Sequence, residues 1–216
     1  MSLLEKKESK NFISVLSSDG TLRMVVPEGT EGGEWRDYET KDGVKGRKFE
    51  RTFTKLEGMI EDLNIYEGDW GKNILLDVKN GEEKCTLSLG TASPFGESFM
   101  KLFPNIDVAK VVSIEPYSFE NDQKKVIKGL SIKQEGEKIK NFYFDSEAKK
   151  SINGIPEPEG DITKYDSESW KIHFLKVRKF LVEETGKRMA EKFPVKVATP
   201  INDYPEDEIN PAAIPF

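Results

Sequence analysis

Short β-rich runs separated by tight-turn dipeptides restrict this chain to a mainly β fold. Asn80-Gly81 separates the runs 73–79 and 84–89, and Asp19-Gly20 separates two similar runs nearer the N-terminus. Asn-Gly and Asp-Gly readily adopt the positive φ angles that a tight hairpin turn requires. Both dipeptides therefore predict β-hairpins, in which neighbouring strands pair antiparallel.

Further runs rich in β-branched and aromatic residues complete the predicted set of strands. A helix is predicted over residues 93–103, with Ser93 as its N-cap and Pro94 in its first turn. From residue 47 to residue 133 the order is three strands, a helix and two strands. The predicted strands cover residues 11–16, 21–26, 47–67, 73–79, 84–89, 110–117, 125–133 and 138–145.

This order is that of an OB-fold, a five-stranded and partly open barrel. The predicted fold class is thus mainly β with α additions: an OB-fold-like barrel, an extra N-terminal hairpin, a short helix after the third barrel strand and a C-terminal helix. A β-sandwich with one helix remains the alternative. Gly58 lies where the apolar residues of run 47–67 change parity, which predicts a bulge or bend. Residues 27–46, dense in glycine and charge, are predicted to be a mobile loop or flap.

The C-terminal part of this domain contains a linker and a helix. Residues 148–165 are rich in Gly, Pro and acidic residues and are predicted to be the linker. Residues 166–193 form the predicted helix, in which Gly186 is a candidate break. Its apolar residues Trp170, Phe174, Val177 and Leu181 recur at helical spacing. Packing against the barrel is the favoured interpretation, and dimerisation or DNA contact is the alternative.

The composition argues against catalysis. One cysteine, Cys85, and one histidine, His173, cannot form an intrachain disulfide framework or a Cys/His zinc site. No glycine-rich run has the context of a phosphate-binding loop, and no carboxylate run has a metal-ligand spacing. We therefore predict a protein that is not an enzyme and that uses no cofactor and no metal. A charged N-terminus and the lack of a long apolar run predict a cytoplasmic protein that does not contact the membrane.

One stretch combines positive charge with aromatic rings. Residues 41–55 contain six Lys or Arg residues against Asp42 and Glu50, with Phe49 and Phe53 interleaved. Basic side chains follow a phosphate backbone, and exposed rings stack on bases of any identity. Strand alternation places Phe49, Arg51 and Phe53 on one face. Whether the two rings stack on a ligand or belong to the core stays open, because alternation does not say which face is solvated.

Other aromatic residues are candidates for base stacking. Trp35 and Tyr38 lie in the predicted flap, and Trp70 lies in a predicted turn. Tyr143 is predicted to be a surface ring, opposite a core pair formed by Phe142 and Phe144. The complete set of predicted DNA-binding residues is Trp35, Arg36, Tyr38, Lys45, Arg47, Lys48, Phe49, Arg51, Phe53, Lys55, Trp70, Lys72 and Tyr143.

The last residues form a separate unit of unusual composition. Residues 194–216 are predicted to be a disordered acidic tail after a domain that covers 1–193, because prolines interrupt the chain and acidic residues dominate it. A final Phe ring beside a carboxylate suits a small apolar pocket rimmed by basic residues. An ordinary frayed terminus is the alternative. The predicted partner-binding residues are Asp203, Glu206, Asp207, Glu208, Ile214, Pro215 and Phe216.

This tail, closing on Ile214-Pro215-Phe216, resembles the C-terminal tip of bacterial single-stranded DNA-binding proteins. It differs in that residues 209–213 separate Glu208 from the final tripeptide. The resemblance implies that the tip docks onto replication and repair enzymes, in the cytoplasm of a bacterium or of a phage-infected host. The size of the chain and its extra elements look more like a divergent phage-encoded relative than the compact bacterial protein.

The function expected from barrel, basic stretch and tail is binding of single-stranded DNA without strong sequence preference, during replication, recombination or repair. The net charge of −6 does not exclude this, because four of the 39 acidic residues lie in the tail. An RNA-binding OB-fold protein and a non-catalytic β-sandwich interaction or virion protein are the alternatives. The sequence leaves a homo-oligomer open.

Overall fold

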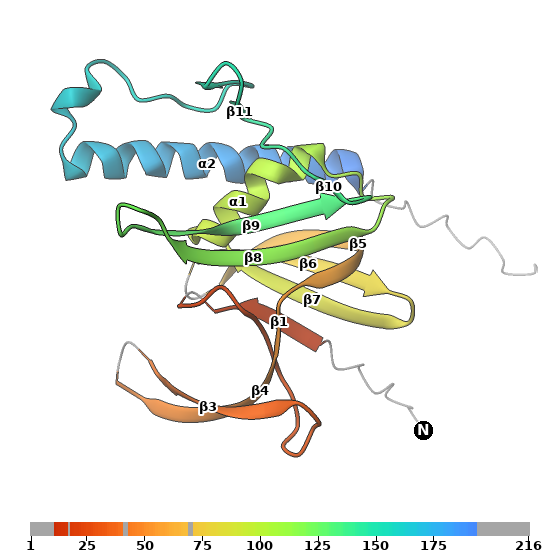
Figure 1. Ribbon diagram of the computed structural model, residues 1–216. Helices are drawn as coiled ribbons and strands as arrows, with labels where there is room; N and C mark the ends of the chain where they lie inside the picture. Colours follow the sequence, from red (N-terminus) through yellow and green to blue (C-terminus); the bar gives the residue numbers. More distant parts are fainter. Residues whose placement is uncertain (1–10, 17, 41–42, 69–70, 194–216) are drawn as a thin grey trace, which may run out of the picture.

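The computed structural model describes residues 11–16, 18–40, 43–68 and 71–193, and within them ten strands form one mixed sheet (Figure 1). The order across the sheet is β10-β9-β8-β5-β6-β7-β1-β2-β4-β3. Its strands are β1 (Asn11–Val15), β2 (Leu22–Val25), β3 (Gly33–Glu39), β4 (Lys45–Phe53), β5 (Leu56–Gly68), β6 (Gly71–Asn80), β7 (Glu83–Gly90), β8 (Val112–Glu120), β9 (Val126–Gln134) and β10 (Glu137–Lys138).

The remaining elements lie on or beside this sheet. They are α1 (Pro94–Leu102), the 3₁₀ turn η1 (Phe103–Asn105), a separate strand pair of β11 (Phe144–Asp145) and β12 (Lys150–Ser151), the 3₁₀ turn η2 (Ile162–Lys164) and α2 (Ser167–Lys192). Figure 1 shows α2 above α1, the sheet below them, and the β3–β4 hairpin standing away from both helices. The prediction of a mainly β fold with a C-terminal helix is confirmed.

The predicted hairpins and the order of the central elements are confirmed. β1 pairs antiparallel with β2, and β6 pairs antiparallel with β7. Gly20 and Gly81 have φ angles of 76° and 61°, which explains why glycine stands in both turns. β5, β6 and β7 form an antiparallel meander that is followed by α1 and then by the β8–β9 hairpin.

The core lies between the meander, the β8–β9 hairpin and α1. Alternate residues of β6 (Ile74, Leu76 and Val78) are buried, as expected for a strand with one face toward the core. Phe95 and Phe99 of α1 are buried in the same core cluster. The Ser93 hydroxyl accepts a hydrogen bond from the Gly96 amide at 3.0 Å, so the predicted N-cap is confirmed.

The sheet does not close into a barrel. The part of the β9 edge that β10 does not cover faces α1, where the Ser98 hydroxyl accepts from the amide of Leu130 at 3.1 Å and donates to its carbonyl at 3.2 Å. The edge of β7 is occupied by β1, which pairs with it in parallel. The two edges that closure would join therefore already have other partners. The five-stranded barrel predicted from the order of elements is not what the structure shows.

The segment from residue 27 to residue 67 differs from the prediction. Residues 27–46 are not simply a loop, because β3 pairs with β4 along its whole length. The predicted strand over 47–67 is two strands, β4 and β5, separated by Thr54 and Lys55. A side chain at Gly58 would place its Cβ 2.5 Å from the carbonyl oxygen of Lys79, so glycine permits a close approach of β5 to β6. The pairing register shifts just beyond it, between Ile60 and Asp62.

The predicted strand over 138–145 is also wrong. β10 ends at Lys138, and the chain then turns toward α1. The Phe142 amide donates to the carbonyl of Lys101, and the Tyr143 amide donates to the side chain of Asn141. These bonds replace the ladder of a strand, because they direct the backbone to a helix rather than to a neighbouring strand.

The helix α2 is continuous. The Asp166 side chain accepts from the Ser169 amide at 2.8 Å at its start, and the helix passes Gly186 without a break. Val177 and Leu181 pack against the body, which confirms the predicted packing face for them, whereas Phe174 is 54% exposed. None of the helices in the described parts of the chain is both long and apolar enough to cross a membrane.

Candidate nucleic-acid interface

The candidate interface lies on the hairpin of β3 and β4, here called the arm. The register pairs Trp35 with Phe49 and Asp37 with Arg47. Directly paired residues of antiparallel strands point to the same side of the sheet. The arm therefore has two distinct faces, and the sequence of β4 decides their composition.

One face of the arm alternates basic and aromatic side chains. It is formed by Lys45, Arg47, Phe49, Arg51 and Phe53 of β4 together with Trp35 of β3, and is here called the stacking face. This arrangement confirms that Phe49, Arg51 and Phe53 share a face. Since Met24 and Leu22 of β2 pair with Arg51 and Phe53, the stacking face continues the core-facing side of the sheet outward.

The two phenylalanines of β4 have different surroundings. Phe53 packs against the core cluster. Phe49 packs edge-on against Trp35, with ring centroids 5.4 Å apart, and its ring also covers Gly33, where an added Cβ would lie 2.3 Å from it. Trp35 remains 45% exposed, and the Arg47 guanidinium lies 4.8 Å from its ring centroid. This end of the stacking face thus presents a ring and a cation to solvent.

Carboxylates of β3 offset part of the positive charge. Asp37 lies 2.9 Å from Arg47, and Glu39 lies 3.8 Å from Lys45. The charge balance of residues 41–55 does not include these two acids, because they belong to β3, the strand paired with β4. Arg51 instead lies over the Phe53 ring at 5.2 Å and makes no ion pair with the described carboxylates. Among the described side chains, Arg51 is therefore the cation of this face that has no carboxylate partner.

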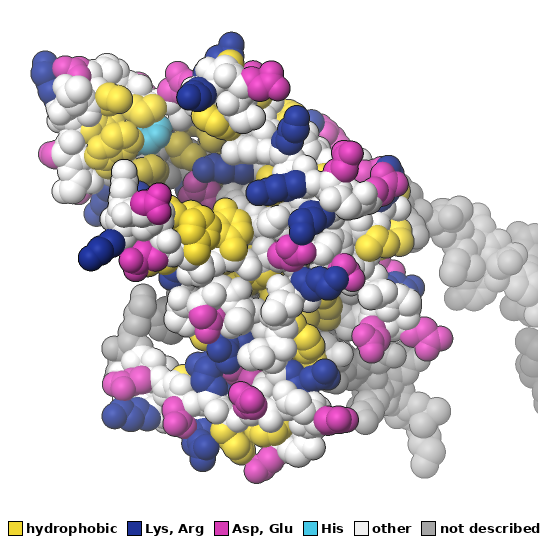
Figure 2. All heavy atoms as spheres, viewed as in Figure 1, with side chains coloured by type: hydrophobic (Ala, Val, Ile, Leu, Met, Phe, Trp, Pro, Cys, Tyr) yellow, Lys and Arg dark blue, Asp and Glu magenta, His cyan; other side chains and the backbone are white. Residues whose placement is uncertain are grey.

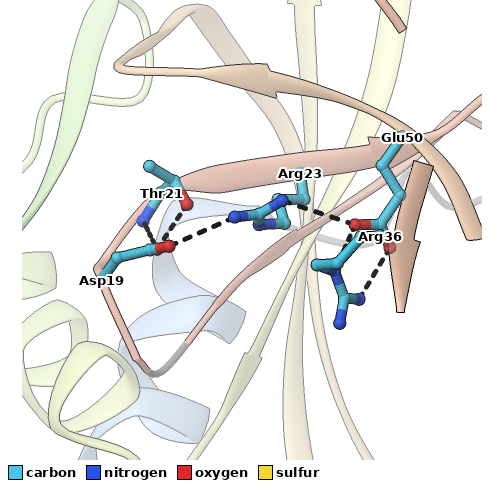
Figure 3. A network of polar contacts seen from close by, with 5 residues as sticks. All are labelled: Asp19, Thr21, Arg23, Arg36 and Glu50. Atoms are coloured by element: carbon cyan, nitrogen blue, oxygen red, sulfur yellow. Dashed lines mark hydrogen bonds and ion pairs between the residues drawn. The ribbon is translucent and has the colours of Figure 1, made fainter. Parts of the chain in front are cut away.

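The opposite face of the arm holds an ionic network around one buried carboxylate, that of Glu50 (Figure 3). Both oxygens of Glu50 accept hydrogen bonds from Arg36, at 2.7 Å and 2.9 Å, and Arg23 lies 3.7 Å from the same carboxylate. Arg23 also bonds Asp19, whose side chain accepts from both the amide and the hydroxyl of Thr21. The network joins the β1–β2 turn, β2, β3 and β4, and so fixes the arm to the sheet.

Glu50 is the centre of this network. Its side chain is only 5% exposed. The hydrogen bond from Arg36 lowers the pKa of Glu50, and the same bond raises the pKa of Arg36. Arg36, predicted as a DNA contact, has its guanidinium occupied in this way. On the same face Lys48 lies over the Tyr38 ring at 4.9 Å.

A groove adjoins the inner end of the stacking face. Its volume is about 650 Å³, and Arg51, Phe53 and Lys55 are among the residues that line it. Lys55 makes an ion pair with Glu57 at 2.8 Å. Ile13, Leu22 and Met24 form the apolar part of the lining. The groove therefore brings together three of the predicted residues with an apolar surface.

The other predicted residues do not join this site. Tyr143 is buried, with its ring centroid 5.5 Å from that of Phe180, so the prediction of a surface ring is wrong. Burial raises the pKa of Tyr143. The reason is the turn after β10, which inverts the expected alternation and leaves Phe144 45% exposed. Lys72 is exposed at the start of β6. Outside the described residues lie Trp70, Asp203, Glu206, Asp207, Glu208, Ile214, Pro215 and Phe216.

Sequence reasoning missed a second aromatic pair, in which one ring is exposed. Tyr117 and Phe119 of β8 have ring centroids 5.9 Å apart, and Phe119 is exposed. Lys124 and Lys125 follow in the β8–β9 turn. The sequence does contain a signal for this pair: two aromatic residues two positions apart in a strand, shortly before two lysines.

The described residues contain no group of three or more His, Cys, Asp or Glu side chains placed to hold a metal ion. No protein-family model, no curated protein and no solved structure matches this chain. The stacking face, with its rings and its cations, is the arrangement from which a function can be argued.

Proposed function

We propose that this chain is a non-catalytic protein that binds single-stranded DNA without strong sequence preference. The observation that carries the proposal is the stacking face, in which Arg47 and Arg51 flank the rings of Trp35 and Phe49. Cations follow the phosphates of a single strand, while rings stack on bases irrespective of their identity. In duplex DNA the bases are already stacked and paired, so a face of this kind favours the single strand.

The sheet supports this proposal as an open variant of the OB-fold. The meander β5–β6–β7, the helix α1 and the hairpin β8–β9 follow in the OB order, and β8 pairs antiparallel with β5. An OB-fold is a partly open barrel whose surface binds oligonucleotides. In this variant, β1 takes the place beside β7, and the β3–β4 arm extends the sheet beyond it.

The tail adds a second proposed role, the recruitment of replication and repair enzymes. Its acidic residues and the closing Ile214-Pro215-Phe216 resemble the partner-binding tip of bacterial single-stranded DNA-binding proteins. A divergent phage-encoded member of that group is the identity that we infer. The tail and the arm would act separately, because one is a peptide ligand for proteins and the other is a surface for DNA.

Titration with labelled oligonucleotides tests the proposal directly. We expect tight binding of oligo-dT and of mixed-sequence single strands, and much weaker binding of duplex DNA and of RNA of the same length. With three cations on the stacking face, the slope of log K against log salt should be about −2 for a single strand. Equal or tighter binding of RNA would favour an RNA-binding protein. Binding of neither at low salt would contradict the proposal and favour an interaction module.

Neutralising the acids of β3 should strengthen DNA binding. In the double variant D37N/E39Q, Arg47 and Lys45 lose their ion-pair partners, and phosphates no longer meet two carboxylates. Because exposed ion pairs contribute at most about 1 kcal/mol each, we expect a gain in affinity of about three- to tenfold at low salt. The gain should shrink as salt rises. Measurement is by fluorescence anisotropy of labelled oligo-dT.

The matched control for this experiment is E34Q, on the opposite face of the same strand. It removes one carboxylate from β3 without freeing a cation of the stacking face. An affinity that rises equally in E34Q would show that net charge, and not the stacking face, sets DNA binding.

A further inference from the structure

A stripe of α2 that faces away from the body combines apolar and charged residues in a regular pattern. It consists of Glu168, Ile172, Leu175 and Lys179, at successive spacings of four, three and four residues. At 3.6 residues per turn these positions fall within an arc of about 60°. Ile172 is 49% exposed and Leu175 is 50% exposed. We call these four residues the outer stripe.

The outer stripe lies roughly opposite the residues that anchor α2. Val177 and Leu181, which are buried against the body, are on the other side of the helix. The linker covers a neighbouring side, where Lys176 makes an ion pair with Glu159 at 3.0 Å. Neither contact reaches the stripe.

The first half of α2 is apolar on both sides. Trp170 and Phe174 stack on one another with ring centroids 5.7 Å apart on the side of the anchoring residues, and Ile172 and Leu175 lie on the outer stripe. Figure 2 shows hydrophobic side chains gathered at this end of α2, at the upper left. Neighbouring exposed apolar side chains often mark a surface that contacts a partner. The outer stripe is therefore a candidate contact surface.

The charges of the outer stripe indicate which partner fits it. When two copies of α2 pack antiparallel about a two-fold axis midway between residues 172 and 175, Ile172 of one copy meets Leu175 of the other. The same axis places Glu168 of one copy opposite Lys179 of the other. The stripe is thus complementary to itself, as an isologous two-fold interface requires. The spacing of four and three residues is that of helices packed along a shared seam.

We propose that this protein forms a homodimer through antiparallel packing of the outer stripes of α2. Glu168 and Lys179, at the two ends of the stripe, can replace their present ion-pair partners with residues of the other copy. Glu168 now lies 3.8 Å from Lys171, and Lys179 lies 4.0 Å from Glu183, and these exposed pairs hold their partners weakly. Two apolar residues per copy make a seam smaller than that of a stable dimer, so the dimer is weak and forms at high protein concentration.

Dimerisation has a consequence for any ligand of the arm. The contact uses only α2, so it leaves the arm of each copy uncovered. When one arm of a dimer binds a long strand, the second arm is held at a high effective concentration near the same strand. The dimer should therefore bind a long strand more tightly than a monomer does. The dimer itself does not depend on the proposed function, because its evidence lies entirely on α2.

Charge reversal tests the proposed register. Sedimentation velocity of the full chain from about 1 μM to about 500 μM should show a monomer–dimer equilibrium. E168K and K179E should each weaken dimerisation about tenfold, because symmetry turns two attractive pairs into two repulsive ones. The double variant E168K/K179E restores the pairs with reversed sign and should dimerise nearly as well as the unmodified chain.

The control variant is K187E, an exposed position of α2 that lies outside the stripe. Its dissociation constant should be unchanged, and thermal unfolding of each variant establishes that the helix is intact. L175E, which places a carboxylate in the centre of the seam, should give a monomer. A chain that is monomeric at the highest concentration would overturn the proposal, and so would a double variant that dimerises no better than either single one.

Discussion

Replacing Trp35 and Phe49 together with alanine should weaken binding of oligo-dT by about a hundredfold. A stacked ring contributes about 1 to 3 kcal/mol per base, and the two rings support one another on the stacking face. The loss should leave the fold intact, since neither ring belongs to the core cluster. Anisotropy titration at fixed salt measures the affinity, and circular dichroism during heating measures stability.

F144A is the matched control, because Phe144 and Trp35 are both 45% exposed but lie on different parts of the protein. Its affinity for oligo-dT should change less than twofold, which corresponds to under about 0.4 kcal/mol. If F144A weakened binding as much as the double variant, the arm would not be the site. If the double variant bound normally, the stacking face would not contact bases.

E50Q should destabilise the fold strongly, although it keeps the shape of the side chain. Gln keeps the size of the side chain, but it removes a buried negative charge that Arg36 and Arg23 share. Removing one partner of a buried ion pair leaves the other partner uncompensated. Because Arg36 is partly exposed, we expect a loss of about 2 to 3 kcal/mol in the free energy of unfolding. Urea denaturation measures this loss, and limited proteolysis shows whether the arm opens first.

The same substitution should change the response to acid. The pKa of Glu50 is lower in the folded chain than its ordinary value of 4.5, chiefly because of the hydrogen bond from Arg36. A carboxylate of this kind stabilises the fold above its unfolded pKa, and the contribution is lost as pH falls through its folded pKa. The unmodified chain should therefore lose more stability than E50Q between pH 5 and the acid limit of the titration, roughly pH 2.

E34Q provides the comparison for both measurements. Glu34 pairs directly with Glu50 in the register of the arm, but it is exposed. E34Q should keep both the stability and the acid response of the unmodified chain. A Glu50 variant with an unchanged acid response would show that the network contributes no pH-dependent stability.

Local signals in the sequence predicted the elements that depend on neighbouring residues. Asn80-Gly81 correctly predicted a hairpin and Ser93 correctly predicted the start of a helix, because each acts through hydrogen bonds within a few residues. The glycines of the arm were misread for a related reason. Gly33 and Gly46 suggested a loop, yet they lie within β3 and β4 and are covered by the rings of Phe49 and Tyr38. A cross-strand ring can replace the missing side chain of a strand glycine.

The missed features depend on contacts between distant residues. Alternation along β4 predicted which residues share the stacking face, but it could not show that Asp37 pairs with Arg47. The open sheet depends on Ser98 and on the parallel pairing of β1, neither of which has a local signal. Tyr143 was misplaced because alternation holds only while the chain remains a strand.

The ends of the ten-stranded sheet bear on how safely many copies can crowd together. An outermost strand offers unpaired backbone groups to which another chain can add, and this is a route to aggregation. β3 is outermost at one end and carries Glu34, Arg36, Asp37 and Glu39 among its seven residues. β10 is outermost at the other end and is only two residues long. Charge at one end and shortness at the other protect the sheet from strand addition, so neighbouring molecules can lie close together without fusing their sheets.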